Sequence, residues 1–227
     1  MKSPQGGESA DLRHVTTWLF DLDNTLYPLE SGLGVAISDR ITDYTQRLTG
    51  LPREEARALQ KRYLDEHGLT LRGLMLHHGV DPDDYHAQFQ DLSLEALASD
   101  AGLTAAIARL PGRRLVFTNA DAGHAGRVLR RLDLEHLFDD VFHIAAADFV
   151  PKPSPEAFER LAAAHAIEPA ATCFFEDSWR NLEPAAALGM TTVLVGEAAK
   201  GSTAPFVSYR APDLAAFLSA ARLQEPV

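Results

Sequence analysis

The sequence predicts a doubly wound (Rossmann-like) parallel α/β sheet core with an inserted α-helical cap domain. Three observations indicate this: five short apolar runs, helical patterns that alternate with them after residue 110, and a long interval with helical signals alone. Alternating strands and helices are typical of a parallel sheet covered on both faces. We expect a flexible N-terminal tail at 1–13, a core at 14–27 and 111–227, and a helical cap at 28–110.

The five apolar runs are expected to be strands. Each is nearly continuous in apolar residues, without the strict alternation of a strand that has one face in water, so both faces should be buried. The predicted strands are 16–22, 114–118, 141–145, 172–176 and 192–195.

Helical patterns separate these strands. Residues 122–132 carry Val128, Leu129 and Leu132 on one face, and Ser154 followed by Pro155 provides an N-cap and a proline at the first helical position. A further helix is expected at 181–188, where Gly189 ends it.

The interval between Tyr27 and Leu110 has helical signals and no strand signal. Its first helical face carries apolar residues at helical spacing and stops at Gly50, and further helix starts follow at Pro52 and at Asp81 with Pro82. A helical insertion of this size predicts a second small domain, or lid, over the edge of the sheet.

Composition limits the classes of function. The chain of 227 residues has 21 basic and 32 acidic side chains and a net charge of −11, which opposes binding to a nucleic acid polymer but permits a small phosphorylated ligand in a local pocket. No apolar run approaches the ~18 residues of a membrane span. The polar first eleven residues lack the apolar segment of a signal peptide. The single cysteine, Cys173, lies in an apolar run and predicts a buried thiol, which fits a cytoplasmic location.

The first predicted strand ends in two carboxylates, Asp21 and Asp23. Residues two apart in a strand point to the same face, so these side chains should lie together at the carboxyl end of the strand. That edge is where ligands bind in open α/β sheets. Adjacent carboxylates repel each other unless a cation or a shared proton relieves them, which points to a divalent metal.

Three later strands end in a related way. Thr118 and Asn119 follow the second, and a hydroxyl with backbone N–H groups there could bind phosphate or could only cap a helix. Lys152 stands between two prolines after the third, as a fixed cation or as a solvated loop residue. Glu176 and Asp177 end the fourth. Carboxylates from two strands suit Mg²⁺, which takes one or two of them together with substrate phosphate.

With these motifs the sequence resembles the haloacid dehalogenase-like hydrolase superfamily of the helical cap type. Residues 21–25 resemble its first motif, Thr118 its second, Lys152 its third and 176–178 its fourth. The resemblance implies that Asp21 is the nucleophile that forms an aspartyl-phosphate, and that Asp23 is the general acid and base. It also implies that Thr118 and Lys152 hold phosphoryl oxygens.

The same resemblance implies a Mg²⁺ cofactor bound by the Asp21 carboxylate, the Asp23 backbone carbonyl and Asp177. Glu176 departs from the double aspartate of many members, so its ligation is left open between direct and water-mediated. Dehalogenases of the superfamily lack the second acid of the first motif, and Asp23 therefore favours phosphate chemistry.

The cap segments 67–74 and 77–81 resemble the pyrimidine 5′-nucleotidase branch. We therefore expect a phosphoric monoester hydrolase acting on a small phosphorylated metabolite, a pyrimidine nucleoside 5′-monophosphate, with Asn119, Arg72 and His77 as substrate-binding residues. A sugar-phosphate phosphatase, a phosphomutase and a non-catalytic binding protein are the alternatives. The oligomeric state is left open.

Overall fold

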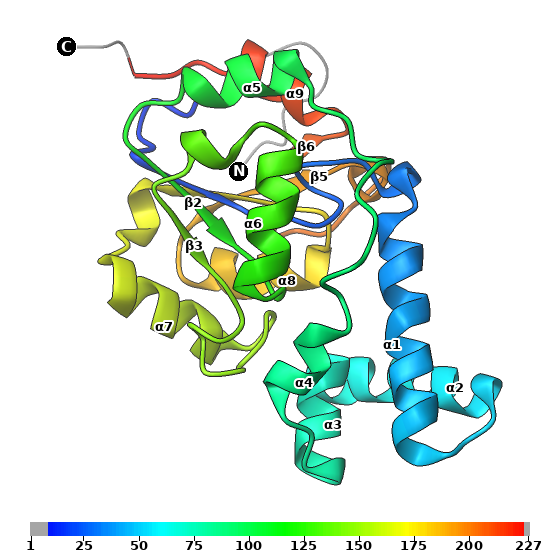
Figure 1. Cartoon of the computed structure of the whole chain (residues 1–227). Coiled ribbons are helices and arrows are strands. Elements are labelled where there is room, and N and C mark those ends of the chain that lie inside the picture. The colour runs from blue at the N-terminus through cyan, green and yellow to red at the C-terminus, as the bar shows by residue number, and fades with distance from the viewer. Residues whose placement is uncertain (1–8, 225–227) are drawn as a thin grey trace.

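A computed structural model describes residues 9–224 and shows a six-stranded sheet with helices on both faces (Figure 1). The strand order is β3-β2-β1-β4-β5-β6, and all pairings are parallel. The strands are β1 (Thr17–Phe20), β2 (Arg113–Phe117), β3 (Asp140–Phe142), β4 (Thr172–Glu176), β5 (Thr191–Val195) and β6 (Tyr209–Ala211). The predicted doubly wound parallel α/β fold is confirmed.

The register brings the predicted polar residues to one edge of this sheet. Leu19 in the central strand β1 pairs with Leu115 of β2 on one side and Phe174 of β4 on the other. The two neighbours therefore end level with β1. Because all three strands run in the same direction, the residues that follow them meet at the carboxyl edge.

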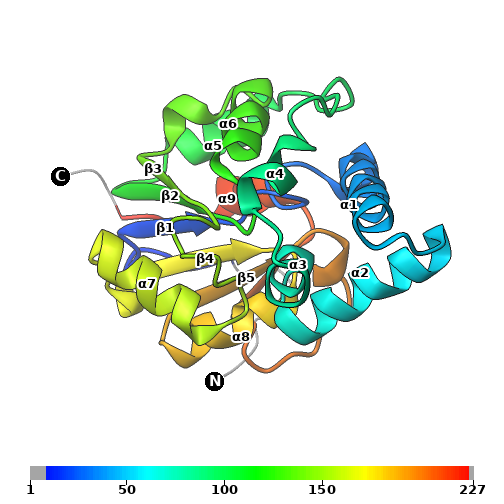
Figure 2. The ribbon, with the colours of Figure 1, turned by 60° about the horizontal axis from the view of Figure 1, so that its bottom comes forward.

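Each face of the sheet buries its own apolar cluster. Trp18 and Phe20 of β1 face one cluster and Leu19 faces the other, as the two-residue period of a strand requires. The first face is covered by α5 (Ala101–Ala108), α6 (Ala122–Arg131) and α9 (Leu214–Ala220), and the second by α7 (Pro155–His165) and α8 (Trp179–Ala187). Figure 2 shows the sheet between these two helical layers.

Four helices form a separate body beside the carboxyl edge of the sheet (Figure 1). They are α1 (Leu33–Thr49), α2 (Arg53–His67), α3 (Thr70–His78) and α4 (Pro82–Ala87). Buried residues of these helices and of the segment that follows α4 form a third apolar cluster that includes Leu59, Tyr63, Leu74, Tyr85 and Phe89. We call this body the cap.

The packing of two segments bears on the predicted domain boundaries. Helix α5 was expected in the cap, yet Leu103, Ala106 and Ile107 are buried in the first core cluster, so we propose that the cap ends near Leu92. The expected tail at 1–13 falls partly outside the described residues. Its last part is packed: Leu12 is fully buried and its backbone N–H donates to the carbonyl of Arg222.

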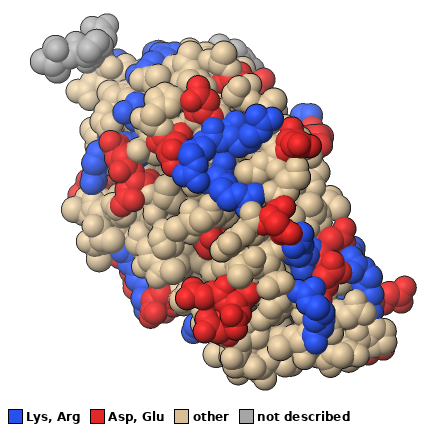
Figure 3. Space-filling model, in the orientation of Figure 1, with Lys and Arg blue, Asp and Glu red and all other residues tan. Residues whose placement is uncertain are grey.

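Arginines of α6 hold the chain where it returns from the cap to the core. Arg127 donates to the carbonyls of Phe89, at 2.8 Å, and of Leu92. Arg131 donates to the carbonyl of Leu94 at 3.0 Å. In Figure 3 basic side chains gather over α6 among acidic neighbours. These bonds fix the return segment of the cap to the core.

The remaining elements are short. In the described part of the chain, four 3₁₀ turns lie at Leu29–Ser31, Glu135–Leu137, Pro169–Ala171 and Glu197–Ala199. The three-residue β6 was not predicted, because so short an edge strand carries no periodic signal. Within residues 9–224, no helix combines the length and the apolar character needed to cross a lipid bilayer. Cys173 is buried, as predicted.

Candidate active site

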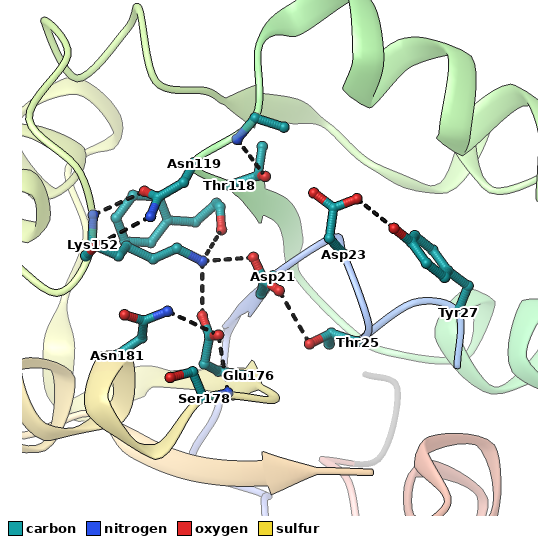
Figure 4. Close-up of polar contacts among 12 residues, drawn as sticks. Asp21, Asp23, Thr25, Tyr27, Thr118, Asn119, Lys152, Glu176, Ser178 and Asn181 are labelled. Atoms are coloured by element: carbon teal, nitrogen blue, oxygen red, sulfur yellow. Dashed lines mark hydrogen bonds and ion pairs between the residues drawn. The ribbon is translucent and has the colours of Figure 1, made fainter. Parts of the chain in front are cut away.

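A buried ammonium group links the ends of three strands. The Nζ of Lys152 donates to Asp21 Oδ1 at 2.7 Å, to Glu176 Oε2 at 2.8 Å and to the carbonyl of Phe117 at 2.8 Å (Figure 4). Lys152 is 1% exposed and Asp21 is 6% exposed. All three ammonium protons are therefore used inside the protein, and the predicted surface alternative for Lys152 is wrong.

Burial and charge set the protonation of this cluster. Burial and the neighbouring Glu176 raise the pKa of Asp21 to about 7, and burial also raises the pKa of Glu176 to about 7. Burial lowers the pKa of Lys152, but the two carboxylates outweigh that effect and hold it above its ordinary value. Lys152 stays charged and favours the ionised form of Asp21.

The loop that carries Lys152 is held by Asn119. The Asn119 amide donates from Nδ2 to the carbonyl of Lys152 at 3.1 Å, and its Oδ1 accepts from the backbone N–H of Lys152 at 2.9 Å. We predicted Asn119 as a substrate-binding residue. Both ends of its amide bind the Lys152 backbone, so we propose a positioning role for Asn119, and its contact with substrate stays a prediction.

Thr118 lies directly after β2 and is 2% exposed. Its Oγ1 accepts from the backbone N–H of Ala120 at 3.0 Å. The hydroxyl proton has no acceptor within residues 9–224, so it can be donated to a ligand. This arrangement suits the predicted contact with a phosphoryl oxygen.

Asp23 is held by two donors from different parts of the chain. Tyr27 donates its hydroxyl to Asp23 Oδ1 at 2.6 Å, and His124 Nε2 lies 3.0 Å from the same oxygen. Burial raises the pKa of Asp23, but the His124 and Tyr27 hydrogen bonds more than offset this and hold it below its ordinary value. The Asp23 side chain is 29% exposed, unlike that of Asp21.

Carboxylates at the strand ends form a possible metal site. Ligand atoms of Asp21, Glu176 and Asp177 lie within 4.8 Å of one another, and burial together with Asp21 raises the pKa of Asp177 to about 6. A cation would relieve this crowding, and a set of hard carboxylate oxygens suits Mg²⁺. Since no donor among the described residues occupies the backbone carbonyl of Asp23, that oxygen is also available.

Glu176 is the least available of the predicted metal ligands. Its Oε2 accepts from Lys152, and its Oε1 accepts from the backbone N–H of Ser178 at 3.2 Å and from Asn181 Nδ2 at 3.0 Å. We propose that Asp21 and Asp177 bind the metal directly, and that Glu176 mainly holds Lys152.

Two hollows flank these residues where the cap faces the core. The hollow beside Asp23 and His124 has a volume of about 170 Å³ and is lined mainly by apolar and aromatic side chains. The hollow beside Lys152 and Ser178 is lined mostly by polar and charged residues and measures about 580 Å³. His86 and Phe89 of the cap line the first, and Glu66 and Gly68 line the second.

The two cap residues that we predicted to contact substrate, Arg72 and His77, do not line these hollows. Arg72 is half-buried in α3 and lines neither hollow. His77 is exposed; its ring stacks on Tyr63 with a centroid distance of 5.1 Å, and its Nε2 lies 3.2 Å from Nε2 of His67. Because neither side chain lines either hollow, the structure gives no support to their predicted substrate contacts.

Sequence reasoning missed the contacts of His124 and Tyr27 with Asp23. Asp121 caps α6 and accepts from the backbone N–H of His124 at 3.0 Å. A histidine in the first turn of the helix that follows β2 is therefore carried to the carboxyl edge of the sheet. The position of His124 in the sequence could therefore have indicated that it lies near the site.

Gly68 brings the cap against the Lys152 loop. Its φ is +75°, and a Cβ there would lie 3.2 Å from Pro151 Cγ and 3.3 Å from the carbonyl of Lys152. Gly68→Ala should lower kcat/KM for phosphomonoester hydrolysis by about tenfold, because the added methyl group displaces the Lys152 loop. Gly50→Ala is the matched control, since Gly50 also ends a cap helix, at φ +70°, and has nothing within 4 Å. Equal effects of both variants would show that backbone strain alone matters.

Comparisons with known proteins agree with this geometry. The profile of the haloacid dehalogenase-like hydrolases matches residues 15–189. Phosphate metabolism protein 8 of Saccharomyces cerevisiae is 26% identical over 193 residues, which cover 78% of this chain and 60% of the yeast protein. The chain thus spans less than two thirds of that relative.

Solved structures share the fold at low sequence identity. CbbY from Rhodobacter sphaeroides, in complex with phosphate, matches with a TM-score of 0.62 and 21% identity, covering 90% of this chain and 99% of CbbY. The L-2-haloacid dehalogenase of Xanthobacter autotrophicus matches with a TM-score of 0.55 and 17% identity, covering 90% and 97%. On the profile match, which extends from before β1 to just beyond α8, the chain belongs to the haloacid dehalogenase-like hydrolases.

Proposed function

We propose that the chain is a Mg²⁺-dependent phosphomonoesterase that works through an aspartyl-phosphate on Asp21. One observation carries the proposal: the two carboxylates of the first motif have different environments. Asp21 is buried and paired with Lys152, whereas Asp23 is partly exposed and held by neutral or cationic donors. This difference suits one carboxylate that attacks and one that moves protons.

Asp23 also separates phosphatase from dehalogenase chemistry, which the fold does not. A departing alkoxide requires a proton, whereas a departing halide does not. An acid held at the entrance of an apolar hollow is therefore useful to a phosphatase.

In the first step an Asp21 carboxylate oxygen attacks phosphorus, and the bond from phosphorus to the ester oxygen breaks. The ester oxygen takes a proton from Asp23 and leaves as an alcohol. Thr118 donates its hydroxyl to a phosphoryl oxygen. Lys152 supplies positive charge, and it can bind a phosphoryl oxygen directly once its bond to the Phe117 carbonyl is released.

In the second step Asp23, now a carboxylate, takes a proton from water while the water oxygen attacks phosphorus. The bond to Asp21 breaks, and inorganic phosphate leaves. Asp23 ends the cycle protonated, ready for the next ester. When bound to Asp21, Asp177 and the Asp23 carbonyl, Mg²⁺ would neutralise phosphoryl charge and keep Asp21 ionised.

The hollow beside Asp23 supports a nucleoside as the leaving group, and we propose a pyrimidine nucleoside 5′-monophosphate as the substrate. Its apolar and aromatic walls suit a planar base. His86 and Asp121 add polar groups for the base edges. The apolar and aromatic lining residues are Ile37, Ile41, Leu69, Leu71, Tyr85 and Phe89.

A panel of phosphomonoesters tests this proposal. Phosphate release should be fastest with UMP or CMP, slower with purine nucleotides and sugar phosphates, and lost on chelation with EDTA until Mg²⁺ is added back. Efficient turnover of a sugar phosphate without turnover of UMP and CMP would exclude the nucleotidase assignment. A requirement for a sugar bisphosphate as activator would identify a phosphomutase. Undiminished turnover in EDTA would contradict the metal dependence.

A further inference from the structure

Asp23 presents its two oxygens to different surroundings. Oδ1 receives both the Tyr27 hydroxyl, at 2.6 Å, and His124 Nε2, at 3.0 Å. No other hydrogen bond to the Asp23 carboxylate occurs within residues 9–224. In Figure 4 the second oxygen points toward the side of the site where Thr118 lies. The carboxylate is therefore held by one oxygen and free at the other.

The two donors are anchored independently of the cap. Tyr27 is 4% exposed and belongs to the first core cluster. His124 is 6% exposed, and its backbone is fixed by the N-cap Asp121. Both side chains arise from the core, so they hold Asp23 whether or not a substrate is bound. Side chains locked in this way can keep a catalytic group within the narrow geometric limits of proton transfer.

We propose that Tyr27 and His124 are positioning residues that hold Oδ1 of Asp23 and thereby direct Oδ2, with its proton, to the leaving-group oxygen. This inference rests on the proposed phosphatase function. When the proton of Asp23 lies on Oδ2, Oδ1 can only accept, so His124 donates from Nε2 and the Tyr27 hydroxyl donates as well. An oxygen that already accepts two hydrogen bonds is the poorer site for a proton, which leaves Oδ2 as the oxygen that is protonated.

The proposal predicts a loss that depends on the leaving group. p-Nitrophenolate departs without a proton, whereas the alcohol of an alkyl phosphate needs the proton of Asp23. Loss of one donor should therefore slow alkyl esters more than p-nitrophenyl phosphate. The parameter to compare is kcat/KM, because it reports the steps up to the departure of the alcohol and excludes hydrolysis of the phosphoenzyme.

The variants are Tyr27→Phe, His124→Leu and His124→Gln. Tyr27→Phe and His124→Leu should each lower kcat/KM for an alkyl phosphate by about tenfold more than for p-nitrophenyl phosphate, a part of the roughly 10²–10⁴-fold that general acid catalysis contributes. His124→Gln keeps a donor of similar reach and should recover part of that loss. Tyr209→Phe on the edge strand β6 and His136→Gln, which is exposed, are the matched controls.

The result that overturns the proposal is an equal loss, or no loss, with both classes of ester in Tyr27→Phe and in whichever His124 variant folds. A plot of log kcat/KM against leaving-group pKa across substituted phenyl and alkyl phosphates should be steeper in the variants, and an unchanged slope would also contradict it. Circular dichroism confirms that each variant is folded. If the unmodified protein hydrolysed neither ester in Mg²⁺, the proposed phosphatase function itself would fail, which is a separate result.

Discussion

Asp21→Asn is expected to abolish phosphomonoester turnover while leaving the protein folded. Asparagine has nearly the same shape, but its amide cannot attack phosphorus. The expected loss in kcat is about 10³-fold or more. Phosphate release from UMP and from p-nitrophenyl phosphate measures it, and both substrates should be affected equally because the nucleophile serves every ester.

The matched control for this variant is Asp133→Asn. Asp133 has a positive φ of 58° and a side chain that is 79% exposed, so asparagine fits it without strain. It should retain full activity. Substantial phosphatase activity in Asp21→Asn, at a level above contamination, would show that another group attacks phosphorus.

Lys152→Met is expected to have the largest effect on stability. The substitution keeps the volume of the side chain and removes the cation that pairs with Asp21 and Glu176, both almost fully buried. Breaking a buried ion pair from one side costs about 3–5 kcal/mol in the free energy of unfolding. Urea denaturation in EDTA measures it, and activity should be lost as well.

The decrease in the free energy of unfolding caused by Lys152→Met should depend on pH. Without the ammonium group, burial leaves the folded-state pKa values of Asp21 and Glu176 above their unfolded values, and such acids destabilise the folded state increasingly as pH rises. The deficit should therefore be greater near about pH 8 than near about pH 5. Lys61→Met is the control, because Lys61 is 77% exposed and its contact with Asp65 is a surface pair worth at most about 1 kcal/mol. A deficit that does not change with pH would mean that lost packing, rather than charge, is responsible.

The core of the site could be predicted because, in a parallel sheet, the place of a residue in the sequence relative to a strand determines at which edge of the sheet it lies. A residue that follows a buried strand in such a sheet lies at the carboxyl edge, whatever the rest of the chain does. Asp21, Thr118 and Asp177 were found in this way, and the structure brings them together. Lys152 was expected near the site, but the strand pattern does not reveal that it is buried beneath two carboxylates or that Asn119 binds its backbone.

The cap contacts could not be predicted in the same way. Helical periodicity identifies the apolar face of a helix but not the body against which it packs. For this reason α5 was assigned to the cap, although it lies on the sheet. Arg72 and His77 were selected for their chemistry, and only the orientation of α3 shows that they line neither hollow. His124 reaches Asp23 across 101 positions of sequence.

The most direct test of the account is detection of the phosphoryl group on Asp21. In Asp23→Asn the general base is lost, so p-nitrophenyl phosphate should still phosphorylate the protein in Mg²⁺ while hydrolysis of the intermediate slows. Acid quenching followed by peptide mass spectrometry should then find one phosphoryl group on the peptide that contains Asp21, and none in Asp21→Asn with the same substrate. A phosphoryl group on another residue, or release of p-nitrophenolate by Asp23→Asn without any phosphorylated protein, would contradict the account.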